Sequence, residues 1–215
     1  MSVQLPNGFT IALATTYGSA KTVTALTNAN PAVGTTSAAH GISNGAILEV
    51  TSGWQRINSR GVRAAAAAGS SISYEGFDTT SLTNYPAGTG IGSIREITAF
   101  TQISQITDLT TSGGDMQFST YSFLENDFES QLPTQASAQS LTITIADDPS
   151  LAGYIALKAA GEDRSIRMLK MTTPSGGILL YNGYVSFNET PALSKGNINT
   201  VSATFSLLAK PTRYA

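Results

Sequence analysis

The residues of this chain that could do acid–base chemistry are few and scattered. The one histidine, His40, lies in the stretch Ala38-Ala39-His40-Gly41, with no acidic residue near it in sequence. A serine or cysteine triad needs a histidine as its proton shuttle, and a metal site needs more ligands than one imidazole. The small residues around His40 and the turn expected after it favour a structural role.

Three carboxylates recur at every second residue, a spacing that would put them on one face of a strand. They are Glu125, Asp127 and Glu129. Two paired carboxylates could serve as the acid and base of a glycosidase, whereas three in a row among Ser and Thr are more typical of a solvated or repulsive face. We favour the second interpretation. The hydrolase stays an alternative, which replacement of Glu125 or Asp127 by alanine would test.

Two further motifs are too incomplete to indicate a site. Gly88-Thr89-Gly90-Ile91-Gly92 resembles a nucleotide loop, but Ser93 stands at the third glycine position and no strand–loop–helix context surrounds it. The sequon Asn188-Glu189-Thr190 carries no weight without a secretory signal. The absence of cysteine excludes disulfides, thiolate chemistry and cysteine-bearing zinc sites. The sequence therefore predicts no catalytic residue, no cofactor and no metal.

The charge of the chain is low and unevenly distributed. Charged residues make up 12% of the sequence, about half the usual share, and such a surface keeps copies apart poorly. Residues 64–160 carry ten acidic and two basic residues, whereas the segments on either side are each net +3. The middle of the chain could therefore face something anionic that it must repel, although solvated loops are the simpler interpretation. The sequence has no cluster of Lys and Arg with aromatic residues between them, so it does not predict a nucleic-acid clamp.

No segment predicts secretion or membrane insertion. The first residues, Met1 to Pro6, lack the basic and apolar regions of a signal peptide. No apolar run approaches the roughly 18–20 residues of a membrane span. We expect synthesis and folding in the cytosol.

Alternating apolar residues predict a chain made mainly of β-strands. Turn residues such as Asn44-Gly45 separate the strands. One helix is expected at about 149–160, with Asp148 as N-cap, Pro149 in the first helical position and Gly161 just beyond its end. The stretch from Ile106 to Ser137 lacks a pattern and is expected to be a long loop. Strands are expected at 8–14, 21–26, 46–50, 62–66, 94–103, 140–146, 165–172, 178–188 and 201–210.

These elements predict an antiparallel β-sandwich or open barrel with one flanking α-helix, plus a small inserted all-β module. Residues 1–14 and 94–215 would form the core, and residues 15–93 the inserted module. Pro86 and the glycines 88, 90 and 92 mark the end of that module.

Several segments of the second half of the chain follow one another in a distinctive order. They are Asp115 to Pro133, the strand Ser140–Ala146, the helix after Asp148, Pro174-Ser175-Gly176-Gly177 leading into Tyr181 to Ser186, and the ending Pro211-Thr212-Arg213-Tyr214. In this order they resemble the major tail tube proteins of long-tailed (siphovirus-type) bacteriophages, and the resemblance covers roughly residues 94–215 and the first strand. Residues 28–78 resemble a small β module found in other phage structural proteins, on the segments Asn30 to Val33, Ala39 to Gly41, Ser43 to Gly45 and Tyr74 to Thr79.

This resemblance implies a structural virion protein and not an enzyme. Members of that family form hexameric rings that stack into a hollow tail tube, assembled in the bacterial host cytoplasm. The implied partners are further copies of the chain, the tape measure protein, the tail terminator and tail-tip proteins, and DNA in transient, non-specific passage, with no membrane insertion. The acids that would line the lumen or a ring interface are Asp115, Glu125, Asp127 and Glu129.

The main alternative is a carbohydrate-binding or adhesin-like β-sandwich module. Such a module would expose aromatic side chains on one face. Trp54 is the one tryptophan, and aromatic residues make up 8% of the chain, which argues against it.

Overall fold

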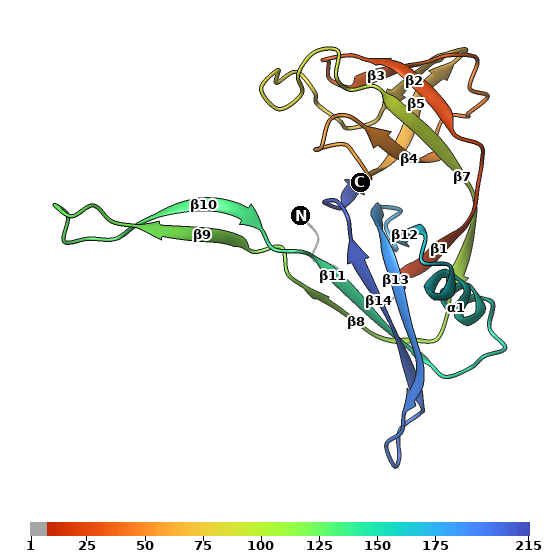
Figure 1. Ribbon diagram of the computed structural model, residues 1–215. Coiled ribbons are helices and arrows are strands. Elements are labelled where there is room, and N and C mark those ends of the chain that lie inside the picture. The colour runs from red at the N-terminus through yellow and green to blue at the C-terminus, as the bar shows by residue number, and fades with distance from the viewer. Residues whose placement is uncertain (1–7) are drawn as a thin grey trace.

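The computed structural model describes residues 8–215, which form fifteen β-strands and one α-helix. The mainly β, antiparallel fold with one helix confirms the fold class predicted from the sequence (Figure 1). The elements are β1 (Thr10–Tyr17), β2 (Lys21–Leu26), β3 (Ala32–Thr36), β4 (Ile47–Ser52), β5 (Gly61–Ala68), β6 (Ser71–Tyr74), β7 (Gly92–Ile103), β8 (Ile106–Ser112), β9 (Met116–Tyr121), β10 (Ser130–Ala136), β11 (Ser140–Ala146), α1 (Ala152–Asp163), β12 (Ile166–Thr172), β13 (Ile178–Ala192), β14 (Thr200–Leu207) and β15 (Thr212–Tyr214).

The larger sheet runs in the order β7-β1-β12-β13-β14-β11-β8 and encloses the main core. The 15-residue strand β13 joins its two parts, because its first half pairs with β12 and its second half with β14. Alternate residues of β11 and β14 point into the core, as the sequence pattern predicts, and pack with residues of β1, β12 and α1. The buried residues of the two strands are Leu141, Ile143, Ile145, Val201, Ala203 and Phe205.

A second core lies inside a small closed barrel. Its strands pair in the order β2-β3-β6-β5-β4-β7, and β7 pairs back to β2, so the ring of six strands has no free edge. Trp54, Ile57 and Tyr74 are buried in it. The first half of β7 belongs to this barrel and its second half pairs with β1 in the larger sheet, so one strand runs through both parts.

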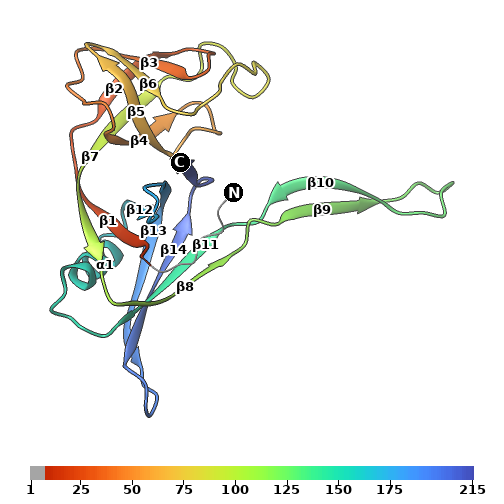
Figure 2. The ribbon, with the colours of Figure 1, turned by 180° about the vertical axis from the view of Figure 1, so that it is seen from behind.

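The barrel packs closely on the larger sheet (Figure 2). The Tyr214 hydroxyl of β15 accepts a hydrogen bond from the Arg63 backbone N–H of the barrel (2.7 Å). Within the larger sheet, at its end nearest the barrel, the Tyr17 hydroxyl accepts one from the Met168 backbone N–H (3.0 Å). Burial raises the pKa of both tyrosines, so neither hydroxyl ionises at neutral pH. The guanidinium of Arg63 also lies 4.5 Å from the centre of the Tyr214 ring.

The helix differs from the prediction at both ends. It begins at Ala152 and ends at Asp163, with Leu151 as N-cap and Arg164 in the left-handed conformation at its end. Asp148 is not the cap, because its carboxylate accepts hydrogen bonds from the N–H and hydroxyl of Ser150 in a local turn. Gly161 is inside the helix, where a Cβ would come within 3.3 Å of Phe187. The small size of Gly161 allows close packing against Phe187, and Gly161 does not end the helix.

The prediction of a long loop between Ile106 and Ser137 is also wrong. It contains β8, which pairs with β11, and the hairpin of β9 and β10. All residues of these three strands are exposed or half-exposed. Because no face of the hairpin is buried, its sequence lacks the alternation by which strands are recognised.

Gly61 provides a test of the contact between barrel and sheet. A Cβ at this position would lie 2.8 Å from the Met168 side chain and 3.0 Å from Leu180 Cβ. We expect Gly61→Ala to lower the free energy of unfolding by about 1–3 kcal/mol through overpacking, measured by denaturant titration. The control is Gly18→Ala, whose Cβ meets its nearest neighbour at 3.6 Å. Equal stability of the two variants would contradict the close packing described for this contact.

Candidate assembly surfaces

The hairpin of β9 and β10, with the turn between them, forms an arm that projects away from the rest of the molecule (Figures 1 and 2). Every residue of β9 is exposed. A two-stranded hairpin alone is marginally stable in water, and a large exposed apolar surface usually marks an interaction site. The arm is therefore a candidate assembly surface. Its exposed apolar residues are Met116, Phe118, Tyr121, Phe123, Leu124, Phe128 and Leu132.

The acidic residues singled out from the sequence all lie on this arm. Asp115 is at its root, where its backbone carbonyl accepts a hydrogen bond from the Ser137 N–H (2.9 Å). Glu125, Asp127 and Glu129 lie in the turn between β9 and β10, so they do not share the face of a strand. All four are exposed, and the sequence has no basic residue between Arg95 and Lys158. The arm is thus both acidic and apolar.

A second surface is the outer face of four neighbouring strands, β13-β14-β11-β8. Its exposed and half-exposed side chains lie in register across the strands and carry hydroxyl, amide or carboxylate groups. Two cross-strand hydroxyl pairs lie within hydrogen-bond distance: Ser112 with Ser140 (3.3 Å) and Thr142 with Thr204 (3.2 Å). No Lys or Arg lies on any of the four strands. The three rows are Tyr184-Ser206-Ser140-Ser112, Ser186-Thr204-Thr142-Thr110 and Asn188-Ser202-Thr144-Asp108.

This four-stranded part of the sheet has two open edges within residues 8–215. On one side β8 pairs only with β11. On the other side β13 pairs only with β14 beyond Tyr184, because β12 begins opposite that residue. Open edges present unpaired backbone N–H and C=O groups to any neighbouring strand.

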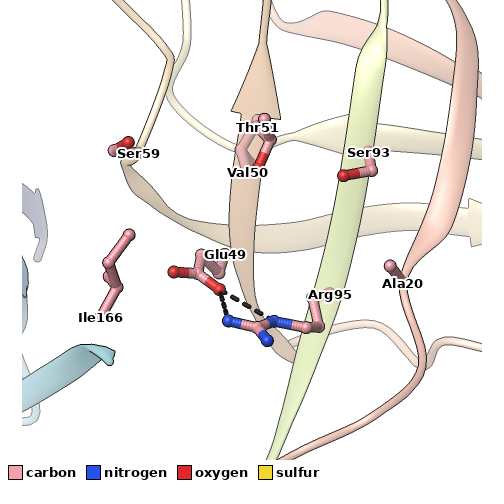
Figure 3. Close-up of a pocket in the computed structure, with 8 residues that line it drawn as sticks. All are labelled: Ala20, Glu49, Val50, Thr51, Ser59, Ser93, Arg95 and Ile166. Carbon is pink, nitrogen blue, oxygen red and sulfur yellow. Dashed lines mark hydrogen bonds and ion pairs between the residues drawn. The ribbon is translucent and has the colours of Figure 1, made fainter. Parts of the chain in front are cut away.

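A polar cavity of about 260 Å³ lies where the barrel meets the larger sheet (Figure 3). The carboxylate of Glu49 is almost buried there and accepts hydrogen bonds from Nε and Nη2 of Arg95. It also accepts one from the side-chain amide of Asn182 (3.2 Å), which in addition donates to the Ser59 carbonyl (3.0 Å). The two charges neutralise each other, so the arrangement links barrel and sheet and lacks a free acid or base for catalysis.

The other sequence motifs are structural. His40 is buried, and its Nδ1 accepts a hydrogen bond from the Ile42 N–H (3.0 Å). Its Nε2 lies 3.0 Å from the Ser71 carbonyl oxygen and therefore carries the proton. Gly90 lies against the Trp54 ring, where a Cβ would come within 2.8 Å. The Asn188 side chain accepts a hydrogen bond from the Thr190 N–H.

Within the part of the chain that the structure describes, no cluster of three or more His, Cys, Asp or Glu side chains could hold a metal ion. None of its helices is both long and apolar enough to cross a membrane. Trp54 is 1% exposed inside the small barrel and cannot serve the aromatic platform that a carbohydrate-binding module needs.

One family of known proteins matches most of the chain. No match is found among curated proteins. Among solved structures, the chain is similar to one from the virion of a native gene transfer agent particle, with 12% identity and a TM-score of 0.41, over 54% of this chain and 89% of the other. The family model of the phage tail tube protein matches residues 52–215. The chain therefore belongs to the phage tail tube protein family and is a structural protein of the virion tail.

Proposed function

We propose that six copies of this chain close into a ring, and that the rings stack into a hollow tube through which the phage genome passes. The observation that carries the proposal is the four-stranded sheet β13-β14-β11-β8 with its two open edges. Its neighbouring strands are all antiparallel, so β8 and β13 run in opposite directions. The edge β8 of one copy can therefore pair in antiparallel fashion with β13 of the next, and the alternation continues around the ring.

The size of such a ring suits the passage of DNA. Six copies would supply a barrel of roughly 24 strands, wider than the 16–18-stranded barrels that leave an aqueous channel. Closing the ring also pairs every exposed edge of the four-stranded sheet, which removes the hazard of uncontrolled edge-to-edge association.

The polar face of the sheet is the one we assign to the lumen. The opposite face is buried in the main core, so it is not available to line a channel. Tight binding to phosphates relies on Lys and Arg contacts, and the polar face has none. Some of the hydroxyl groups on this face are hydrogen-bonded to each other. DNA and the tape measure protein would slide past such a surface without adhering.

The arm is the proposed contact between rings, and its acids Asp115, Glu125, Asp127 and Glu129 would lie at this interface or face the lumen. The small barrel, proposed as an inserted module of residues 15–93, would decorate the ring, since it closes on itself and offers no strand edge. The end rings would meet the tail terminator and tail-tip proteins. All of this work is mechanical, and we propose no catalytic activity.

Engineered disulfides can test the edge pairing, because the chain has no native cysteine. Thr110→Cys on β8 combined in turn with Ser186→Cys, Asn188→Cys or Thr190→Cys on β13 samples three registers on one face. We expect oxidation of assembled protein to give covalent ladders of up to six chains in at least one register, resolved on a non-reducing gel. Thr110→Cys with Thr24→Cys, on the exposed side of β2, is the matched control. Tubes that form without any β8–β13 ladder would contradict the pairing.

Removing the arm should separate ring formation from stacking. We expect a variant with residues 116–136 replaced by a short Gly-Ser turn to fold with an unchanged melting temperature, because the arm contributes nothing to either core. It should form rings but few tubes in negative-stain micrographs. Leu82→Ser, at an exposed leucine of the small barrel, should leave tubes intact. Normal tubes without the arm would refute its role.

Neutralising the acids at the tip distinguishes their two proposed uses. If Glu125, Asp127 and Glu129 pair with basic groups of the next ring, then Glu125→Gln, Asp127→Asn and Glu129→Gln together should weaken stacking and make it less sensitive to salt. If they face the lumen, tube yield should stay constant while DNA is retained more strongly, as scored by co-sedimentation. No change in either measurement would leave the acids without a role in assembly or DNA passage.

A further inference from the structure

An apolar groove of about 600 Å³ opens beside the first half of β8. Ile106 and Leu109 of β8 form one wall, and Phe9, Ile11 and Met171 form the other. Thr107 and Asp108 lie at its rim. The groove is the mouth of the main core on the side where the sheet ends, and a groove of this size and lining accommodates several bulky apolar side chains.

The tip of the arm carries side chains of the matching kind. Leu124 is fully exposed, Phe128 is 80% exposed and Phe123 is 59% exposed. The chain from Gly114 to Glu125 reaches about 40 Å when extended, and the arm points away from the body in both views (Figures 1 and 2). The tip therefore does not cover the groove of its own copy.

Groove and arm are attached to opposite ends of the same strand. The groove lies beside Ile106 to Leu109, at the start of β8, and the arm leaves the sheet after Ser112, at its end. A copy displaced along the direction of β8 thus brings its groove toward the arm of its neighbour. Such a head-to-tail contact does not close on itself and can repeat without limit.

We propose that the groove beside β8 is the receptor for the arm tip of a second copy in the adjacent ring. This inference rests on the proposed function and names the surface that makes the stacking contact. Phe123, Leu124 and Phe128 enter the groove and remove its apolar walls from water. None of the described residues that line the groove is basic, so the attraction inside it is apolar and the acids of the tip stay outside it.

Disulfide trapping tests the assignment. The pair Leu124→Cys and Thr107→Cys should cross-link between copies in assembled tubes at least about tenfold faster than in dissociated protein, because docking raises the effective concentration to the millimolar range. Leu124→Cys with Asn84→Cys, on an exposed loop of the small barrel, is the control. Equal cross-linking to both partners, or to neither in well-formed tubes, overturns the proposal. A bond from Thr107→Cys to Val3→Cys in its place would assign the groove to the N-terminal segment and overturn it as well.

A second variant removes the need for disulfide geometry. Phe123→Ser, Leu124→Ser and Phe128→Ser together should raise the protein concentration needed for tubes at least tenfold, while rings persist in negative-stain micrographs. Loss of rings as well as tubes would count against the proposed function itself. Tubes formed at the original concentration would overturn the groove assignment and leave the ring proposal standing.

Discussion

The structure is governed by the requirement that backbone hydrogen-bonding groups of a strand find partners. The small barrel meets it alone, since β7 pairs with both β2 and β4 and closes the ring of six strands. The larger sheet does not, because β8 and the second half of β13 end it with unpaired edges. One part of the chain therefore pairs all its strands by itself, and the other leaves two strand edges without a partner in the single chain. In the proposed ring a further copy supplies that partner, which fits a member of the tail tube family.

The two parts are joined too closely to move as independent bodies. Strand β7 is shared, Gly61 lies against Met168 and Leu180, and Glu49 is hydrogen-bonded to both Arg95 and Asn182. Burying a charge is tolerable only when it is paired and hydrogen-bonded, and Glu49 satisfies both conditions using groups from the barrel and from the sheet. These hydrogen bonds and packing contacts therefore hold the barrel on the sheet and also fix its position there.

Much of the fold was predictable where one face of a strand is buried. Leu141, Ile143 and Ile145 alternate with threonines, and β11 has the predicted bounds; the same is true of β2. The arm could not be recognised, because its strands expose both faces in the single chain and only a partner would impose a pattern on them. The predicted start of the helix was wrong because the Asp148 carboxylate accepts a hydrogen bond from Ser150 and does not cap the helix. Its predicted end was wrong because Gly161 lies inside the helix and packs against Phe187. The acids at 125, 127 and 129 do not share the face of a strand, because they lie in the exposed turn between β9 and β10. The polar face could not be predicted from the sequence either, because it forms only when β8, β11, β14 and β13 lie side by side in register.

The way the barrel is attached also decides how the molecule bears load. Strands β1 and β7 both lead into the barrel, so a pull on the barrel draws the two strands in the same direction and does not shear the ladder between them. The load falls on the ladder of β1 with β12, where four residue pairs from Thr10 to Leu13 are in register. Hydrogen bonds of an antiparallel ladder lie across the strands, so a force along β1 loads several of them together and does not open them one by one. The attachment is therefore suited to resist traction along β1 and β7.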